Sequence, residues 1–429
     1  MDDTSAPRAA APTQAPAMAK VAGLVAGAFF MEMLDGTVIT TALPAMAKSF
    51  GVGPIDLNIG VTAYLLTLAI FIPLSGWIAE RWGAQRTFGA AIALFTFASV
   101  LCGMSNDLWG FTAARVLQGF GGALMVPVGR FVVLRNTPKS EIVRAIAILT
   151  WPGLLAPVLG PPVGGFITAH ATWRWIFFLN LPLGMIGLVM TFLLIPNFRA
   201  EHRRKLDWIG FVLVALACLS FVYGLSLIGS DTQSLWLPAA LLVAAVIFAC
   251  LAVLHARGHA FPLMDFSVFG IRTFLTSHLG GSLQRATINS APFLLPLMFQ
   301  LGFGFDPVTS GMLLLALFLG NLSIKPATTS ILRRFGFKRV LVVNGFILAA
   351  SLAVYALLWP STPLPVIAIV LFIGAPAARC SSRLSARSLS PTYRKSSWLR
   401  PMCWQPCCSN WRWARAPRSG PLRCARAPS

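Results

Sequence analysis

The stretch that decides the fold lies at residues 208–229 and reads WIGFVLVALACLSFVYGLSLIG. It carries no charged residue, and its length matches the roughly 20 mostly apolar residues that a helix needs to cross a bilayer. Helices of soluble domains keep a polar face, which this stretch lacks. It lies in the middle of the chain, where a signal peptide does not explain it. We therefore predict a membrane-spanning helix.

Stretches of the same kind continue on both sides. With 208–229 they make eleven predicted spans, at 22–43, 58–79, 86–105, 109–134, 145–168, 175–195, 208–229, 236–255, 273–300, 308–331 and 340–359. A twelfth begins near Pro365 and stops early. A mean hydropathy of +0.74 and a charged content of only 11% agree with this class. The prediction is an all-α integral membrane protein with about 11–12 spans.

The net charge of +21 would suggest a nucleic-acid partner if the protein were soluble. However, about eighteen of the 34 Lys and Arg lie in the first residues and in every second loop, in clusters at 81–86, 130–144, 199–205, 257–272 and 333–339. The intervening loops hold Lys48, Arg174, Asp56, Asp107, Asp231 and Asp306. This is the positive-inside pattern with a cytoplasmic N-terminus. We expect the basic loops to face anionic lipid, with no nucleic acid as partner.

Residues 376–429 differ from the rest of the chain. They contain eleven Lys or Arg, no Asp or Glu, four Trp and five of the eight Cys, without an apolar period. A basic cytoplasmic tail, a metal or disulfide module and translation in a wrong reading frame are the three interpretations. Cys403, Cys407 and Cys408 lack zinc-knuckle spacing. A solvated tail rarely carries four Trp without a core, and we expect this tail to be disordered.

The genetic code favours the frameshift interpretation. When the last base of each codon is read with the first two of the next, several residues are fixed whatever codons were used. Cys403-Trp404 then gives Leu, Trp404-Gln405 gives Ala, and Cys407-Cys408 gives Leu. With permitted codons elsewhere, the shifted text reads as a membrane helix. Our hypothesis is a frameshift near residue 376 that replaced the last spans.

Two carboxylates lie within the first span, which reads FMEMLDGTVITTALP at residues 30–44. Glu32 and Asp35 are three residues apart, so they lie on one face of a helix. Carboxylates at membrane depth are costly unless they face a cavity, find partners or bind protons. Either they exchange protons, as a proton-coupled carrier requires, or they are structural acids bonded to backbone or Arg.

The fourth span carries an arginine within RVLQGFGG at residues 115–122. An intramembrane Arg stays charged and needs an acid partner or water. Asp35 and Glu32 are the candidate partners of Arg115. Gln118 of the same stretch is a candidate for a substrate cavity. The glycines that follow allow close helix packing.

The fifth span contains three prolines and four glycines within residues 153–165, among them Gly160, Pro161, Gly164 and Gly165. This composition would break a helix in water. In a bundle it permits a kinked, smooth-faced helix against which another helix can rock. Tight static packing is the alternative.

A loop after the second span repeats later in the chain. Residues 76–86 include Gly76, Glu80, Arg81, Gly83 and Arg86, and the spacing Arg-aromatic-Gly-x-x-Arg returns at 334–339. Two such loops at equivalent places indicate duplicated halves, as transporters have. The span at 273–300 adds three polar candidates for the cavity, namely Gln284, Arg285 and Asn289.

Taken together, these motifs resemble the major facilitator superfamily, and within it the 14-span drug:proton antiporter family. The resemblance rests on Leu34-Asp35-x-Thr37 to Ala42-Leu43-Pro44, Arg115-x-x-Gln118-Gly119, Gly160-Pro161-x-x-Gly164-Gly165 and residues 173–182, WRWIFFLNLP. It covers about residues 20–375. The loop after the second span departs from the family pattern, with Glu80 in place of the usual Asp.

The resemblance implies two six-helix bundles joined through an extra helix pair. The corresponding division is a cytoplasmic segment at 1–20, an N-terminal bundle at 21–195, a loop and extra pair at 196–260, an incomplete C-terminal bundle at 261–375 and the tail at 376–429. It further implies export of drug-like or amphipathic compounds in exchange for protons. Asp35 and Glu32 would be the proton or cation sites, and Arg115 would tune them. Glu80, Arg81 and Arg86 would form the cytoplasmic gate, and the Pro-Gly helix would mark an antiporter.

The expected setting is a bacterial cytoplasmic (inner) membrane, crossed many times. The partners are a small-molecule substrate and the lipid bilayer, with a periplasmic adaptor left open. We expect no cofactor and no metal, only a proton gradient as energy source, and the chain has no Gly-x-x-x-x-Gly-Lys-Ser/Thr loop for ATP. No His pair or Ser/His set suits an enzyme. The alternatives to a drug exporter are a non-transporting remnant and an exporter of another small metabolite.

Overall fold

The computed structural model describes residues 15–54, 56–138, 141–196, 206–228, 236–259, 262–264, 266, 282, 290–323, 334 and 337–374. Every regular element within these residues is a helix. The predicted all-α class is confirmed. The tail at 376–429 and the cavity candidates Gln284, Arg285 and Asn289 lie outside the described residues.

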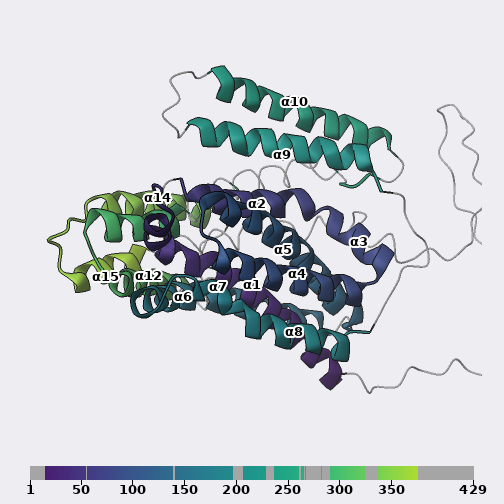
Figure 1. Cartoon of the computed structure of the whole chain (residues 1–429), viewed down its shortest axis with the longest axis horizontal. Coiled ribbons are helices and arrows are strands. Elements are labelled where there is room, and N and C mark those ends of the chain that lie inside the picture. Colours follow the sequence, from purple (N-terminus) through teal and green to yellow (C-terminus); the bar gives the residue numbers. More distant parts are fainter. Residues whose placement is uncertain are drawn as a thin grey trace, which may run out of the picture.

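The N-terminal half is a bundle of long helices (Figure 1). Its helices are α1 (Ala15–Phe50), α2 (Asn58–Phe71), α3 (Leu74–Trp82), α4 (Ala84–Met104), α5 (Leu108–Asn136), α6 (Ile142–His170), α7 (Trp175–Phe178) and α8 (Asn180–Leu194). Helix α1 packs against α5, α6 and α8, and α4 lies against α5 and α8. Two apolar clusters fill the space between them, one toward each end of α1. The polar residues of α1 are therefore carried into the centre of the bundle.

Seven helices of the described part are long and apolar enough to cross a membrane. The predicted second span at 58–79 is broken instead into α2 and α3, which bend by 61°. Pro73 lies at the break, where its ring and missing N–H prevent regular helix. With this pair counted as one span, the number rises to eight. The predicted first span also proves longer, because α1 continues through Pro44 to Phe50.

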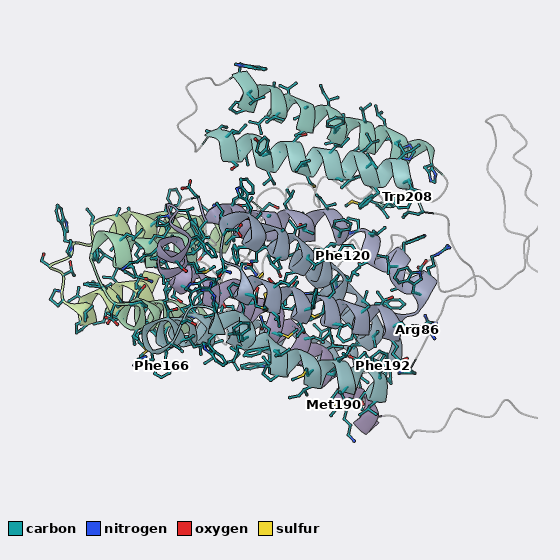
Figure 2. The ribbon with its side chains drawn as sticks, viewed as in Figure 1. Arg86, Phe120, Phe166, Met190, Phe192 and Trp208 are labelled. Carbon is teal, nitrogen blue, oxygen red and sulfur yellow. The ribbon has the colours of Figure 1, made fainter. Side chains whose placement is uncertain are left out.

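The outer surface of the bundle suits lipid. Large apolar side chains such as Phe166, Met190 and Phe192 are exposed on it (Figure 2). Soluble proteins rarely expose apolar side chains over such continuous areas, whereas a bilayer solvates them.

Within residues 196–260, where an extra helix pair is predicted, the structure has the helices α9 (Trp208–Ile228) and α10 (Trp236–Gly258). These helices pack on each other and lie beside the bundle (Figure 1). Helix α9 touches the bundle along α2, where the rings of Phe71 and Phe211 are 5.6 Å apart. Few residues of either helix are buried, so lipid is expected to surround most of the pair.

The described C-terminal part consists of the π-helix η2 (Met298–Gly302), α12 (Pro307–Ser323), α14 (Phe337–Ala356) and α15 (Leu364–Gly374). They share an apolar cluster of their own. None of the four is among the helices of the described part that are long and apolar enough to cross a membrane, and the gaps at 267–281, 283–289 and 324–333 interrupt the predicted spans 273–300 and 308–331. Eleven or twelve spans stay a prediction, as do the proposed domain boundaries.

Candidate functional site

Asp35 and Arg115 form a buried ion pair in the centre of the bundle. Arg115 Nη1 donates to Asp35 Oδ2 at 2.7 Å, and each side chain is 1% exposed. The helices α1 and α5 that carry them pack side by side. Of the two candidate partners of Arg115, the structure pairs it with Asp35. Because the two opposite charges compensate each other, the pair lowers the free-energy cost of placing them at membrane depth.

Two amides complete the shell of Asp35. Its Oδ1 accepts from Gln118 Nε2 at 3.0 Å and from Asn180 Nδ2 at 2.9 Å. Asn180 also donates to Ser99 Oγ at 2.9 Å, and Ser99 donates to the carbonyl of Phe177. Side chains of α1, α4, α5 and α8 are thus joined in one network. A buried polar network stabilises fully only when all its members are satisfied, and here Arg115 Nε has no hydrogen-bond partner among the described residues.

Aromatic rings surround the Arg115 guanidinium. Its central carbon lies 4.8 Å from the ring centre of Tyr64, 5.6 Å from that of Phe177 and 5.8 Å from that of Phe111. Cation–π contacts in a desolvated site are worth about 2 kcal/mol or more. Arg115 is the largest fully buried side chain of the protein's described part. The aromatic rings and Asp35 together stabilise the positive charge of Arg115 in the site.

Glu32 is buried on the same helix but, within the described part of the chain, lacks the hydrogen bonds and the ion pair that Asp35 has. The residue is 5% exposed, and its Oε2 has no hydrogen-bond partner among the described residues. Gly122 of α5 lies beside it, since a Cβ there would sit 3.6 Å from the Glu32 carboxyl carbon. An ionised carboxylate in this position lacks the compensation that Asp35 receives. The two acids of α1 thus differ in chemistry although they share a helix.

Helix α6 uses its glycines to approach two neighbours closely. A Cβ on Gly160 would collide with Thr37 of α1, and one on Gly165 would collide with the carbonyl of Pro307 in α12. A Cβ on Gly311 of α12 would in turn collide with the carbonyl of Pro161. The Pro-Gly segment therefore lies at the contact between the two halves.

Gly164 and a side-chain bond extend this contact. A Cβ on Gly164 would collide with Thr41, and Gln300 Nε2 donates to the Thr41 carbonyl at 3.1 Å. The halves thus meet at the Thr41 end of α1. Toward the other end, α1, α5 and α6 line a groove of about 510 Å³, with Phe29, Met33 and Arg130 among its residues.

The predicted loop after the second span lies apart from this centre. Gly76 and Arg81 are exposed on α3. The central guanidinium carbon of Arg81 lies 5.4 Å from the ring centre of Trp77. Among the described residues, no ion pair joins Glu80 to Arg81 or Arg86. Gly83 has φ +93°, a conformation that favours glycine, and it turns the chain from α3 into α4.

Sequence reasoning did not single out Asn180, Ser99 or Tyr64 as site residues. Asn180 lies within the WRWIFFLNLP stretch, where it is the one amide and, apart from Arg174, is surrounded by apolar residues. A buried amide needs partners, and this was the available signal. Ser99 and Tyr64 gave none, because single hydroxyls are common in membrane helices.

Comparisons with known proteins agree with this architecture. A family model described as Major Facilitator Superfamily matches residues 25–396. The chain is similar to a Pectobacterium atrosepticum protein named "Putative multidrug resistance protein MdtD", with 38% identity over 353 residues, which cover 81% of this chain and 75% of the relative. A Salmonella heidelberg protein of the same name is 39% identical over 343 residues, covering 80% of this chain and 72% of the relative.

Solved structures show the same fold at low identity. The POT family transporter PepTSo matches with a TM-score of 0.61 and 16% identity, over 91% of this chain and 85% of that chain. A D-xylose-proton symporter matches with a TM-score of 0.59 and 13% identity, over 87% and 86% of the two chains. The nucleoside transporter NupG matches with a TM-score of 0.58 and 14% identity, over 89% and 84%.

Proposed function

Since the chain belongs to the Major Facilitator Superfamily, we propose that it exports drug-like or amphipathic small molecules across the membrane in exchange for protons. It is a multi-pass transporter rather than an enzyme, as are its relatives and fold neighbours. The names of the MdtD relatives support the substrate class. An exporter of another small metabolite is the closest alternative.

The observation that carries the proposal is the contrast between Asp35 and Glu32. Asp35 accepts from three donors, one of which is the permanently charged Arg115, whereas Glu32 keeps a buried oxygen without a hydrogen-bond partner among the described residues. Proton coupling needs a carboxyl that alternates between a charged and a neutral state. We assign the ion pair Asp35–Arg115 as the element that is broken and remade, with Glu32 as a second proton or cation site beside it.

The packing of α6 supports alternating access. The halves meet at the Thr41 end through Gly165 and Gly311, while a groove remains at the Arg130 end. In the predicted orientation this is a state closed to the outside. Rocking of α12 on α6 would open it, and the proton gradient would be the only energy source.

The proposed location is a bacterial cytoplasmic membrane with the N-terminus inside. We expect reporter fusions after Arg204 and Lys338 to report the cytoplasm and fusions after Asp107 and Asp231 to report the outside, since basic loops are retained inside. Paired alkaline phosphatase and fluorescent-protein fusions measure this. A reversed pattern at any two of the four sites would overturn the orientation and the span count.

A non-transporting remnant is the second candidate, favoured by the change of composition at residue 376. On this second interpretation, the 429-residue chain gives no resistance in a drug-sensitive host, whereas a frame-restored form gives proton-dependent efflux. The reason is that both end states of a rocking transporter depend on contacts between whole bundles. Efflux of a fluorescent dye from energised cells measures it. Equal activity of the two forms would contradict the remnant interpretation, and inactivity of both would contradict the exporter.

A further inference from the structure

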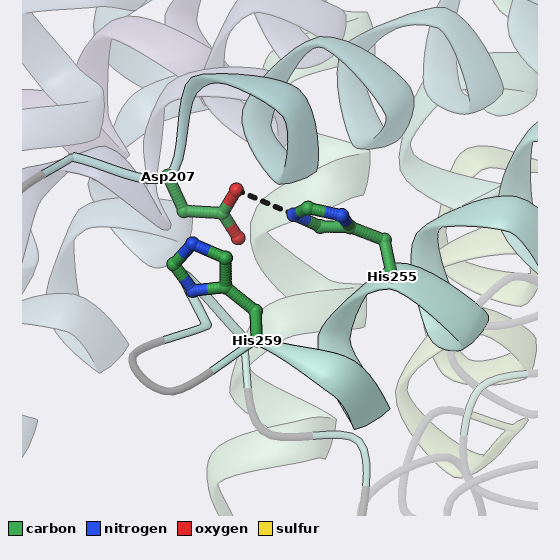
Figure 3. Close-up of side chains that lie close together, drawn as sticks. All are labelled: Asp207, His255 and His259. Atoms are coloured by element: carbon green, nitrogen blue, oxygen red, sulfur yellow. Dashed lines mark hydrogen bonds and ion pairs between the residues drawn. The ribbon is translucent and has the colours of Figure 1, made fainter.

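A second cluster of polar side chains lies far from the ion pair, at the open end of the α9–α10 hairpin. Asp207 immediately precedes α9, His255 is in the last turn of α10, and His259 follows that helix by one residue. One ligand atom from each of the three lies within 4.8 Å of the others. Figure 3 shows both imidazole rings beside the Asp207 carboxylate, with a hydrogen bond drawn between Asp207 and His255.

The carboxylate of Asp207 is buried and held in place. Its Oδ1 accepts from Gly210 N and from His255 Nε2, each at 2.8 Å, and its Oδ2 accepts from Leu263 N at 3.3 Å. Burial alone would raise the pKa of this carboxyl, but the hydrogen bonds outweigh it and lower that pKa. Backbone donors that orient a ligating carboxylate are typical of metal sites.

Both histidines lie at the C-terminal end of α10. They are four residues apart, so they lie on one side of the helix axis. Their ring centres are 5.2 Å apart. Asp207 is buried, His255 is partly buried and His259 is exposed, and a hydrogen bond joins His255 to Asp207.

We propose that Asp207, His255 and His259 form a Zn²⁺ site that clips the open end of the α9–α10 hairpin. Two imidazoles and one carboxylate are a common zinc donor set, and the metal leaves a fourth position for water. Metal–ligand bonds of about 2.0–2.2 Å place tetrahedral ligands roughly 3.3 Å apart, so the three ligand atoms, which lie within 4.8 Å of one another, need to approach by at most about 1.5 Å. His255 Nε2 then turns its lone pair to the metal instead of donating to Asp207.

The competing explanation is a hydrogen bond between Asp207 and His255 without any metal, and it gives His259 no role. The bond between Asp207 and His255 already joins the start of α9 to the end of α10. It needs no third residue. A zinc site needs His259, so this exposed residue separates the two explanations without disturbing the buried ones.

The test measures Zn²⁺ binding by the purified 429-residue chain in detergent, by isothermal titration calorimetry. Because tail cysteines also bind zinc, the background carries Ser at positions of Cys380, Cys403, Cys407, Cys408 and Cys424. We expect one equivalent of Zn²⁺ bound at micromolar concentration or tighter. His259→Ala should weaken binding about tenfold or more, and His170→Ala, another exposed histidine, should leave it unchanged.

Cobalt provides the second readout. A Co²⁺ complex with His and Asp ligands shows weak visible bands without the intense thiolate charge-transfer band, and His259→Ala should abolish them. Zn²⁺ should also raise the thermal unfolding temperature of the parent and not that of His259→Ala, because a ligand stabilises only the form that binds it. Equal affinity of the parent and His259→Ala, or no bound equivalent in the parent, would overturn the proposal. None of these readouts depends on transport.

Discussion

Replacing Asp35 by asparagine is expected to abolish proton-driven efflux and to destabilise the bundle by about 3–5 kcal/mol. The change removes the carboxylate and leaves the Arg115 charge buried without its partner, which is the costly way to break an ion pair. Arg115 is too deeply buried to reach water. Thermal unfolding in detergent and dye efflux from energised everted vesicles, in the frame-restored form, measure the two effects.

Two further variants separate coupling from folding. The double variant Asp35→Asn with Arg115→Gln removes both charges, so it should regain much of the stability and still fail to couple. Glu32→Gln should stay within about 1 kcal/mol of the parent, because Oε2 loses no hydrogen bond. It should reduce efflux less than Asp35→Asn does, and mainly for cationic substrates. Parent-level, gradient-dependent efflux by Asp35→Asn would refute the coupling assignment.

Adding a single methyl group at Gly165 is expected to reduce efflux by about tenfold or more, equivalent to about 1.4 kcal/mol or more in the barrier. The new Cβ would collide with the Pro307 carbonyl. That atom belongs to the backbone and cannot rotate away, so α6 and α12 must separate. The state in which the halves meet at the Thr41 end is then lost. Gly311→Ala should act in the same way from the opposite helix.

Gly153→Ala is the matched control on the same helix. A Cβ at Gly153 meets nothing within 4 Å, and alanine favours helix by about 0.5–1 kcal/mol over glycine. We expect efflux within about twofold of the parent and equal amounts of all three variants in the membrane. Unchanged efflux by both Gly165→Ala and Gly311→Ala would show that this contact is not part of the transport cycle.

The membrane-spanning helices could be predicted from the sequence because apolar length is a one-dimensional signal. The stretch at 208–229 is found almost unchanged as α9. Helix ends were harder to predict, because a membrane boundary need not end a helix: α1 continues past Pro44 to Phe50. The 61° bend at Pro73 was missed, since many membrane helices tolerate proline without breaking.

Asp35, Glu32 and Arg115 were singled out from the sequence, but which acid pairs with Arg115 was not predicted. Glu32 and Asp35 share a face of α1, so spacing alone could not decide which of them meets Arg115. That choice depends on how α1 and α5 are rotated against each other. Asn180 entered the site for the same reason: α8 packs beside α4 and α1, an arrangement that no local pattern encodes.

The buried ion pair also imposes an order on biogenesis. Arg115 remains charged under all physiological conditions, so α5 enters the membrane with a charge that lipid does not accommodate. Its counterion is on α1, which leaves the ribosome before α5, and is therefore already in place when α5 emerges. In general a carboxyl can enter a membrane in its neutral form, whereas a guanidinium cannot. Because the acids are on the earlier helix and the base is on the later one, each helix can insert without an unpaired charge in the lipid.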